Sequence, residues 1–228
     1  RTVTLKSDRL HIVPAHLSDS EAASIPSVYL TAHYALSVLG RVRKGESVLV
    51  HSGAGGVGLA AIAIAKRLGA DVFATAGSPE KRAYLKALGV REAMDSRALA
   101  FTDEIMAATG GRGVDLVLNA LPGPFIEKGL ACLAPYGRFI ELGKRDIYDD
   151  RSLGLKALAR NISLHVVDLA ALIEERPDLA GEMMRDVLAL FTARDLTPPP
   201  VTAFPAGQVT DAFRSFAEAR HIGKIAID

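Results

Sequence analysis

The chain has 228 residues, of which 49% are hydrophobic and 23% charged, and its 27 basic and 26 acidic residues leave a net charge of +1. This composition is typical of a globular protein and gives no electrostatic reason to expect binding to nucleic acid or to an anionic membrane. The single cysteine, Cys132, excludes an internal disulfide and a cysteine-based zinc site, so we expect no metal and a reducing, cytoplasmic location.

The N-terminal part of the chain gives weak signals, and a regular alternation begins at residue 46. Short β-like pieces at 1–5 and 10–13 precede SDSEAA, which predicts a helix start with Ser18 or Ser20 as its cap. The expected strands are 47–51, 71–76, 91–95, 115–120, 138–143 and 162–167, and the expected helices lie near 56–69, 79–88, 102–109, 124–133 and 153–159. This order predicts an α/β fold with a doubly wound, six-stranded parallel sheet of the Rossmann type.

The C-terminal part breaks this alternation. Residues 171–194 are expected to be helical, and TPPPVTAFP at 197–205 is expected to be a linker or an edge strand, because proline does not fit a central strand. An amphipathic helix over 208–220 and a short strand at 224–227 complete the predicted elements.

A glycine-rich turn, HSGAGGVG at 51–58, connects the first strand to a helix of small residues. Gly53, Gly55 and Gly58 form a G-x-G-x-x-G pattern, which allows a tight turn and a close approach to a pyrophosphate at the helix N-terminus. Gly56 and Val57 of the same turn are further candidate cofactor contacts. The alternative is a glycine-rich turn without a ligand. A Walker A loop is excluded, because Leu59 stands where that motif requires lysine.

The end of the second strand indicates which dinucleotide binds. NAD-binding folds place an acidic residue there to bind the ribose 2′-hydroxyl, and this sequence has Ala76, Gly77 and Ser78 instead. Ser78 and Lys81 are therefore candidates for a 2′-phosphate, with Arg97 as a second cationic partner. This favours NADP over NAD. A solvated helix lysine is the alternative for Lys81.

Two charged residues follow the last two strands of the predicted sheet. Strand 138–143 runs into Lys144 and strand 162–167 into Asp168, and neighbouring strands lie about 4.8 Å apart. A lysine beside a carboxylate at this edge is a candidate proton donor or anion stabiliser, whereas a solvated charged loop is the alternative. Asn119 and Gly143, at the ends of two strands, are added as candidate cofactor contacts. The histidines His33, His51 and His165 and the cysteine Cys132 are expected to be packed rather than catalytic.

Several strings together resemble the enoylreductase domains of modular polyketide synthases and animal-type fatty acid synthases. They are VLVHSGAGGVGLAAIAIAKRLGA, VFATAGSPEKRAYLKALG, GRGVDLVLNAL, APYGRFIELGKRDIY and ARHIGKIAI. These domains belong to the medium-chain dehydrogenase/reductase superfamily, and the resemblance covers nearly the whole chain.

The resemblance implies NADPH-dependent reduction of a 2-enoyl thioester on an acyl carrier protein. It assigns Lys144 and Asp168 as the proposed proton donors, Lys81 as a cofactor phosphate contact, and Thr31 as a residue near the nicotinamide. The implied partners are the acyl carrier protein and neighbouring synthase domains, with a homodimer as a further expectation.

One departure from the family concerns domain organisation. We expect 1–30 to be the tail of a β-rich, GroES-like substrate-binding domain, 31–195 to be the NADP-binding Rossmann domain, and 196–228 to return to the substrate-binding domain. Because the first residue is Arg1, the sequence is interpreted as a piece of a longer protein. The expected missing part includes a tyrosine that some family members use to set product stereochemistry. A free-standing quinone or enone reductase and a non-catalytic nucleotide-sensing module remain alternatives.

Overall fold

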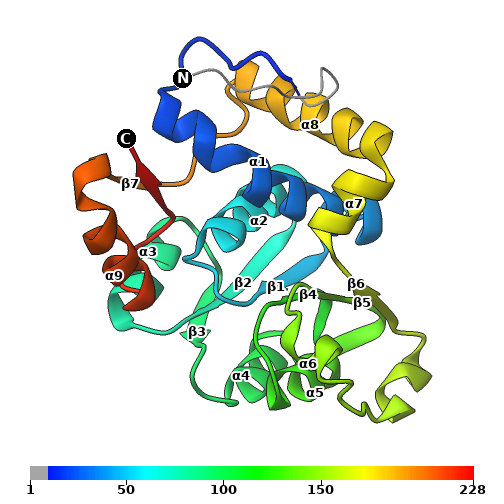
Figure 1. Ribbon diagram of the computed structural model, residues 1–228. Coiled ribbons are helices and arrows are strands. Elements are labelled where there is room, and N and C mark those ends of the chain that lie inside the picture. The colour runs from blue at the N-terminus through cyan, green and yellow to red at the C-terminus, as the bar shows by residue number, and fades with distance from the viewer. Residues whose placement is uncertain (1–9) are drawn as a thin grey trace.

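The computed structural model describes residues 10–228, and its centre is a parallel sheet with helices on both faces (Figure 1). The strand order is β3-β2-β1-β4-β5-β6, so the predicted doubly wound sheet is confirmed. Its strands are β1 (Ser47–Val50), β2 (Asp71–Ala76), β3 (Glu92–Asp95), β4 (Val114–Asn119), β5 (Leu133–Glu141) and β6 (Ser163–Val166). Residues 10–13 form no strand, contrary to the prediction, and residues 1–5 lie outside the described part.

Alternate residues of each central strand enter two different hydrophobic cores. Val48 and Val50 of β1 join the core on one face, while Leu49 between them joins the core on the other. This alternation follows from the two-residue period of a strand. The helices that pack on the sheet are α2 (Gly56–Arg67), α3 (Pro79–Ala87), α4 (Phe101–Ala108) and α5 (Pro124–Ala131).

A long N-terminal helix, α1 (Asp19–His33), packs against α2. Ser18 is its N-cap and exchanges hydrogen bonds with Glu21 in a capping box, so the first of the two predicted caps is confirmed. The helix continues directly into a π-helical segment, η2 (Tyr34–Leu39). The predicted division between residues 30 and 31 falls inside this continuous helix, and it stays a prediction.

The helix predicted over 171–194 is two helices, α7 (Leu169–Glu175) and α8 (Pro177–Thr192). Pro177 causes the break, since it has no backbone N–H and disfavours helical geometry at the preceding residue. The segment predicted as a helix at 153–159 is a 3₁₀ helix, η3 (Leu155–Arg160). A short helix that the sequence did not predict, α6 (Arg145–Tyr148), follows Lys144.

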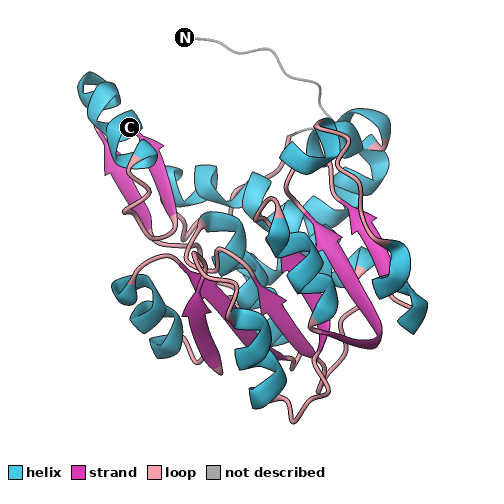
Figure 2. Ribbon diagram, turned by 90° about the horizontal axis from the view of Figure 1, so that it is seen from below, coloured by secondary structure: helices cyan, strands magenta, loops and turns pink. Residues whose placement is uncertain are grey.

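The C-terminal lobe consists of β7 (Val201–Phe204), a 3₁₀ turn η4 (Ala206–Gln208), α9 (Val209–Ala217) and β8 (Lys224–Ile227). Its two strands pair in a separate small sheet, which confirms the edge-strand alternative for 197–205 (Figure 2). The Gly223 N–H donates to the Ala54 carbonyl at 2.9 Å, so the lobe is attached directly to the glycine-rich turn.

Candidate active site

The glycine-rich turn joins β1 to α2 at the carboxyl edge of the sheet. A Cβ at Gly58 would lie 2.5 Å from the Ser52 carbonyl oxygen and 2.6 Å from the Gly53 Cα, so only glycine fits there. Gly55 is the N-cap of α2 and has no side chain to cover the first helical N–H groups. At Gly56 the missing side chain leaves room for Lys224 of the C-terminal lobe, because a Cβ would lie 2.7 Å from its Cδ.

Thr75 of β2 fixes this turn, and sequence reasoning missed it. Its hydroxyl lies 3.0 Å from His51 Nδ1 and accepts from the Ser52 N–H at 3.3 Å, while its carbonyl accepts from the Gly53 N–H at 2.8 Å. Thr75 thus binds three successive residues of the turn. An ordinary strand threonine carries no sequence signal for such a role.

His51 is packed, as predicted, and burial lowers its pKa to about 3. Its ring meets the Phe101 ring edge to face, with centroids 4.8 Å apart. The ring is therefore neutral at physiological pH and contributes shape and one hydrogen bond to the turn.

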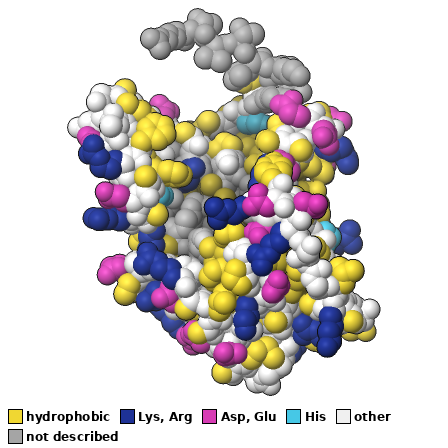
Figure 3. Space-filling model, turned by 60° about the horizontal axis from the view of Figure 1, so that its bottom comes forward, with side chains coloured by type: hydrophobic (Ala, Val, Ile, Leu, Met, Phe, Trp, Pro, Cys, Tyr) yellow, Lys and Arg dark blue, Asp and Glu magenta, His cyan; other side chains and the backbone are white. Residues whose placement is uncertain are grey.

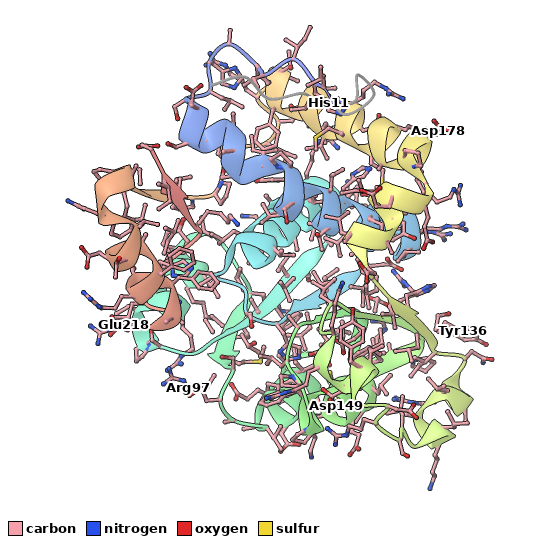
Figure 4. All side chains as sticks on the ribbon, viewed as in Figure 1. His11, Arg97, Tyr136, Asp149, Asp178 and Glu218 are labelled. Atoms are coloured by element: carbon pink, nitrogen blue, oxygen red, sulfur yellow. The ribbon has the colours of Figure 1, made fainter. Side chains whose placement is uncertain are left out.

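A cavity of about 720 Å³ lies beside the turn and contains most of the predicted phosphate contacts. Gly55, Ser78, Lys81 and Arg97 all line it. The opposite wall is residues 218–222, between α9 and β8. Figure 4 labels Arg97 and Glu218 at neighbouring places on the edge of the molecule, and Figure 3 shows Lys and Arg side chains spread over the face that it displays.

The electrostatics of this cavity fit a bound anion. Burial and the neighbouring Arg97 charge lower the pKa of Lys81. Within residues 10–228 neither Lys81 nor Arg97 forms an ion pair, and the Lys81 ammonium donates instead to the Ala219 carbonyl at 2.6 Å. Ser78 caps α3 and accepts from the Lys81 N–H. Two neighbouring cations without a bonded carboxylate are the arrangement that a phosphate monoester stabilises.

Lys144 and Asp168 meet at the ends of two neighbouring strands. The Lys144 ammonium donates to Asp168 Oδ2 at 2.7 Å, and β5 pairs with β6 as the strand order predicts. This hydrogen bond raises the pKa of Lys144 and lowers that of Asp168. Asp168 is also the N-cap of α7, where its Oδ1 accepts from two backbone N–H groups. Asp168 is therefore held as a carboxylate and Lys144 as an ammonium.

A second cavity, of about 570 Å³, lies beside this pair. Thr31, Val57 and Lys144 line it together, with a mostly apolar remainder. The Thr31 hydroxyl donates to the Ser27 carbonyl at 2.7 Å within α1. The structure thus brings Thr31 and Lys144, both predicted near the nicotinamide, to one place with Val57 of the glycine-rich turn.

Asn119 and Gly143 share a partner that the sequence did not indicate, the buried carboxylate of Glu141. Asn119 Nδ2 and the Gly143 N–H each donate to it at 2.6 Å. The Asn119 side chain is fully buried, so it does not line either of the two cavities. Both residues stay predictions as cofactor contacts.

The described residues place further limits on the site. Between residues 10 and 228 no group of three or more His, Cys, Asp or Glu side chains is arranged to hold a metal ion. Cys132 is fully buried in the core, as predicted, and burial raises its pKa to about 12. Of the helices in this part of the chain, none is long and apolar enough to span a membrane.

The chain is similar to a known family and to large multidomain proteins. Residues 56–184 match the family described as zinc-binding dehydrogenase. A phenolphthiocerol/phthiocerol polyketide synthase from Mycobacterium tuberculosis is 48% identical over 215 residues, which is 94% of this chain and 10% of that protein. The chain therefore spans about a tenth of the length of the curated relatives that it matches.

Solved structures agree with this match. CurK enoyl reductase is 37% identical with a TM-score of 0.88, and the match covers 99% of this chain and 68% of that one. The nucleotide-binding subdomain of the enoylreductase domain of PpsC from Mycobacterium tuberculosis is 47% identical with a TM-score of 0.73, covering 76% of this chain and 97% of that one.

Proposed function

Because this chain belongs to the enoylreductase domains of polyketide synthases, within the zinc-binding dehydrogenase family, we propose that it is the NADPH-binding part of an enoylreductase. The reaction would be reduction of the 2,3 double bond of an enoyl thioester. The observation that carries the proposal is the Lys144–Asp168 pair, at the same sheet edge as the glycine-rich turn and its cationic cavity.

The residues around the turn fit NADPH better than NADH. Lys81 and Arg97 would bind the 2′-phosphate, and Ser78 adds a hydroxyl at the same place. The acidic residue that would repel a 2′-phosphate is missing at the end of β2, where Ala76 and Gly77 stand. Glu80 also lines the cavity, in the first turn of α3, where an acidic residue stabilises the helix.

When bound, the dinucleotide supplies a hydride to the β-carbon of the substrate. Negative charge then develops on the thioester oxygen, and the α-carbon needs a proton. The Lys144 ammonium can stabilise that oxygen or give up its proton to the α-carbon, and it regains a proton from solvent. Asp168 holds the ammonium at 2.7 Å, and its own low pKa excludes it as the acid near neutral pH.

The proposal extends to partners and domains. The matched relatives are parts of polyketide synthases, so the substrate would be carried by an acyl carrier protein beside neighbouring synthase domains. Residues 31–195 would form the nucleotide-binding domain, and 1–30 with 196–228 would belong to the substrate-binding domain. The part of CurK enoyl reductase that this chain does not match would correspond to the rest of that domain.

The test uses two proteins, this chain and a longer protein that adds the complete substrate-binding domain. This chain is expected to bind NADPH but to reduce a crotonyl thioester poorly, because both walls of the cleft are needed to position the substrate. The longer protein is expected to reduce the thioester, with a preference for the carrier-bound form. NADPH binding without any turnover in the longer protein would support the nucleotide-sensing alternative, and reduction of quinones alone would support the quinone reductase.

A further inference from the structure

Glu141 is a buried carboxylate without a cationic partner. It ends β5, it is 3% exposed, and it forms no ion pair with any side chain of residues 10–228. A carboxylate in such a place is costly unless hydrogen bonds satisfy it. Burial raises its pKa to about 7, although the bonds from Asn119 and Gly143 oppose that shift.

Its two hydrogen bonds join two loops that follow neighbouring strands. Asn119 ends β4, and its Nδ2 donates to Glu141 Oε2 at 2.6 Å and to the Leu121 carbonyl at 2.8 Å. The Gly143 N–H donates to Glu141 Oε1 at 2.6 Å, and a Cβ at Gly143 would lie only 2.7 Å from that oxygen. Glu141 thereby orders both the 119–121 turn and the backbone directly before Lys144.

We propose that Glu141 is a positioning residue, whose carboxylate ties the loop after β4 to the loop after β5 and so places Lys144 against Asp168. The inference rests on the proposed function for its catalytic consequence only. A second tie between the same two loops, from the Gly123 N–H to Asp146 Oδ2 at 2.9 Å, holds the far side of α6. Glu141 holds the side that carries the ammonium.

The charge state of Glu141 decides whether both bonds form. A carboxylate accepts from both donors, whereas the protonated acid turns one oxygen into a donor and loses one of the two bonds. The charged neighbours are Asp146 of α6, Glu127 of α5 and Arg151, which line the same small cavity. Arg151 is engaged by Asp146 at 3.0 Å and by Glu127 at 3.6 Å, so it does not neutralise Glu141. In β6 the register partner is the uncharged Val166.

The decisive variant is Glu141→Gln, which keeps the shape and the acceptor for Gly143 but turns an NH₂ group toward Asn119 Nδ2. In this chain, NMR titration of the Lys144 ammonium reports on the carboxylate beside it, at a pH at which Glu141 is ionised. The raised pKa of Lys144 is expected to fall in Glu141→Gln, because Lys144 moves away from Asp168. Glu127→Gln is the matched control, since it makes the same change at an exposed position on the same cavity, and it should leave that pKa unaltered.

The kinetic arm uses the longer enoylreductase protein. Glu141→Gln is expected to lower kcat about ten- to hundredfold, as a small misplacement of a catalytic group does. The wild-type kcat should fall as the pH drops through about 7, and the variant should lack this acid limb. An unchanged Lys144 titration in Glu141→Gln overturns the inference. A changed titration in a protein that reduces no thioester leaves the inference standing and rejects the proposed function.

A measurement that needs no substitution covers the case in which Glu141→Gln does not fold. The Gly143 amide resonance of the wild-type chain should titrate with a midpoint near pH 7, since its N–H donates to the titrating carboxylate. A Gly143 resonance that is constant between pH 5 and pH 9, as an approximate working range around that value, contradicts the proposed bond and with it the inference.

Discussion

At the carboxyl end of β2, Lys81 and Arg97 face a cavity and have no ion-paired carboxylate within residues 10–228. At the ends of β5 and β6, by contrast, Lys144 is held by Asp168 at 2.7 Å. Burial and the neighbouring Arg97 charge lower the pKa of Lys81, which gains most from an anionic ligand, whereas the hydrogen bond to Asp168 raises the pKa of Lys144 and fixes its position. The first arrangement is suited to binding a phosphate, and the second to holding a positive charge at a fixed point, where it can stabilise a developing negative charge.

The largest effect is expected at the paired lysine, measured as kcat/KM in the longer protein. Lys144→Ala should cost about ten- to a thousandfold, the usual range for a proton-transfer residue. Asp168→Asn should also lower kcat/KM but keep the N-cap of α7, whereas Asp168→Ala should in addition lower the thermal unfolding midpoint. If the two residues share one task, the Lys144→Ala/Asp168→Ala double variant loses less than the product of the single losses.

NADPH affinity is the control for this pair, because neither residue lines the cationic cavity. Wild-type turnover in both single variants would assign proton delivery to water or to another domain. A collapse of NADPH binding would instead show that the pair is structural, as in the charged-loop alternative.

A smaller effect is expected at the unpaired cation. Lys81→Ala should weaken NADPH binding by about ten- to hundredfold and leave NADH nearly unchanged, because one charged hydrogen bond to the 2′-phosphate is lost. Lys86→Ala is the matched control on the same helix, since Lys86 is already paired with Glu92 at 2.6 Å. Cofactor fluorescence titration measures the NADPH and NADH affinities of each variant. Equal losses of affinity for the two cofactors in Lys81→Ala would reject the assignment of Lys81.

The two ends also differ in how far the sequence predicted them. The G-x-G-x-x-G pattern and the absence of an acid after β2 are local signals, so they predict Gly58, Ser78 and Lys81 directly as cofactor contacts. Lys144 and Asp168 were predicted to meet because strand order makes β5 and β6 neighbours, and the structure shows that they do. Thr75 and Glu141 were missed, since their roles depend on side-chain contacts across strands. The local sequence around a strand threonine or glutamate does not predict such contacts.

The elements were predicted best where a buried strand left one solution. Strands β1, β2 and β4 are of this kind, whereas for the cap of α1 the sequence left Ser18 and Ser20 open and the structure has Ser18. The predictions were wrong where a local effect decided the outcome, as at Pro177, which divides one helix into α7 and α8. Residues 10–13 read as β-like from their apolar side chains, but Ile12 is 92% exposed and no described strand pairs with them.

The glycine-rich turn allows a test that separates folding from binding at the first end. Gly58→Ala places a Cβ 2.5 Å from a backbone oxygen and should destabilise the chain by about 1–3 kcal/mol in urea unfolding. Gly55→Ala meets its nearest atom at 3.4 Å, so stability should be nearly unchanged. Because Gly55 lines the cavity, its variant should still bind NADPH more weakly. Equal stability of the two variants contradicts the close packing inside the turn.

The smallest effect is a pH dependence of stability, which has opposite signs at the two ends. His51, at the turn, has its pKa lowered from 6.5 to about 3, so the unfolded chain binds its proton first and stability falls as the pH drops from 6.5 toward 3. Glu141, at the other end, has its pKa raised from 4.5 to about 7, so the folded chain binds its proton first and stability rises as the pH drops from 7 toward 4.5. Each group contributes at most about 1.4 kcal/mol per pH unit.

Between pH 6.5 and 4.5 these two contributions oppose each other. Together they are therefore expected to change the free energy of unfolding of the wild-type chain little, as measured in urea. Removing one group exposes the other. Glu141→Gln should lose stability more steeply than the wild type as the pH falls through this window, because His51 is then unopposed and His33 and His221, whose pKa values are also lowered, act in the same direction. His51→Asn should shift the slope the opposite way. The comparison uses the slope of the free energy of unfolding against pH, so a loss of stability that is the same at every pH does not affect it. Parallel slopes in the two variants would show that the buried residues at the two ends do not titrate as their surroundings require.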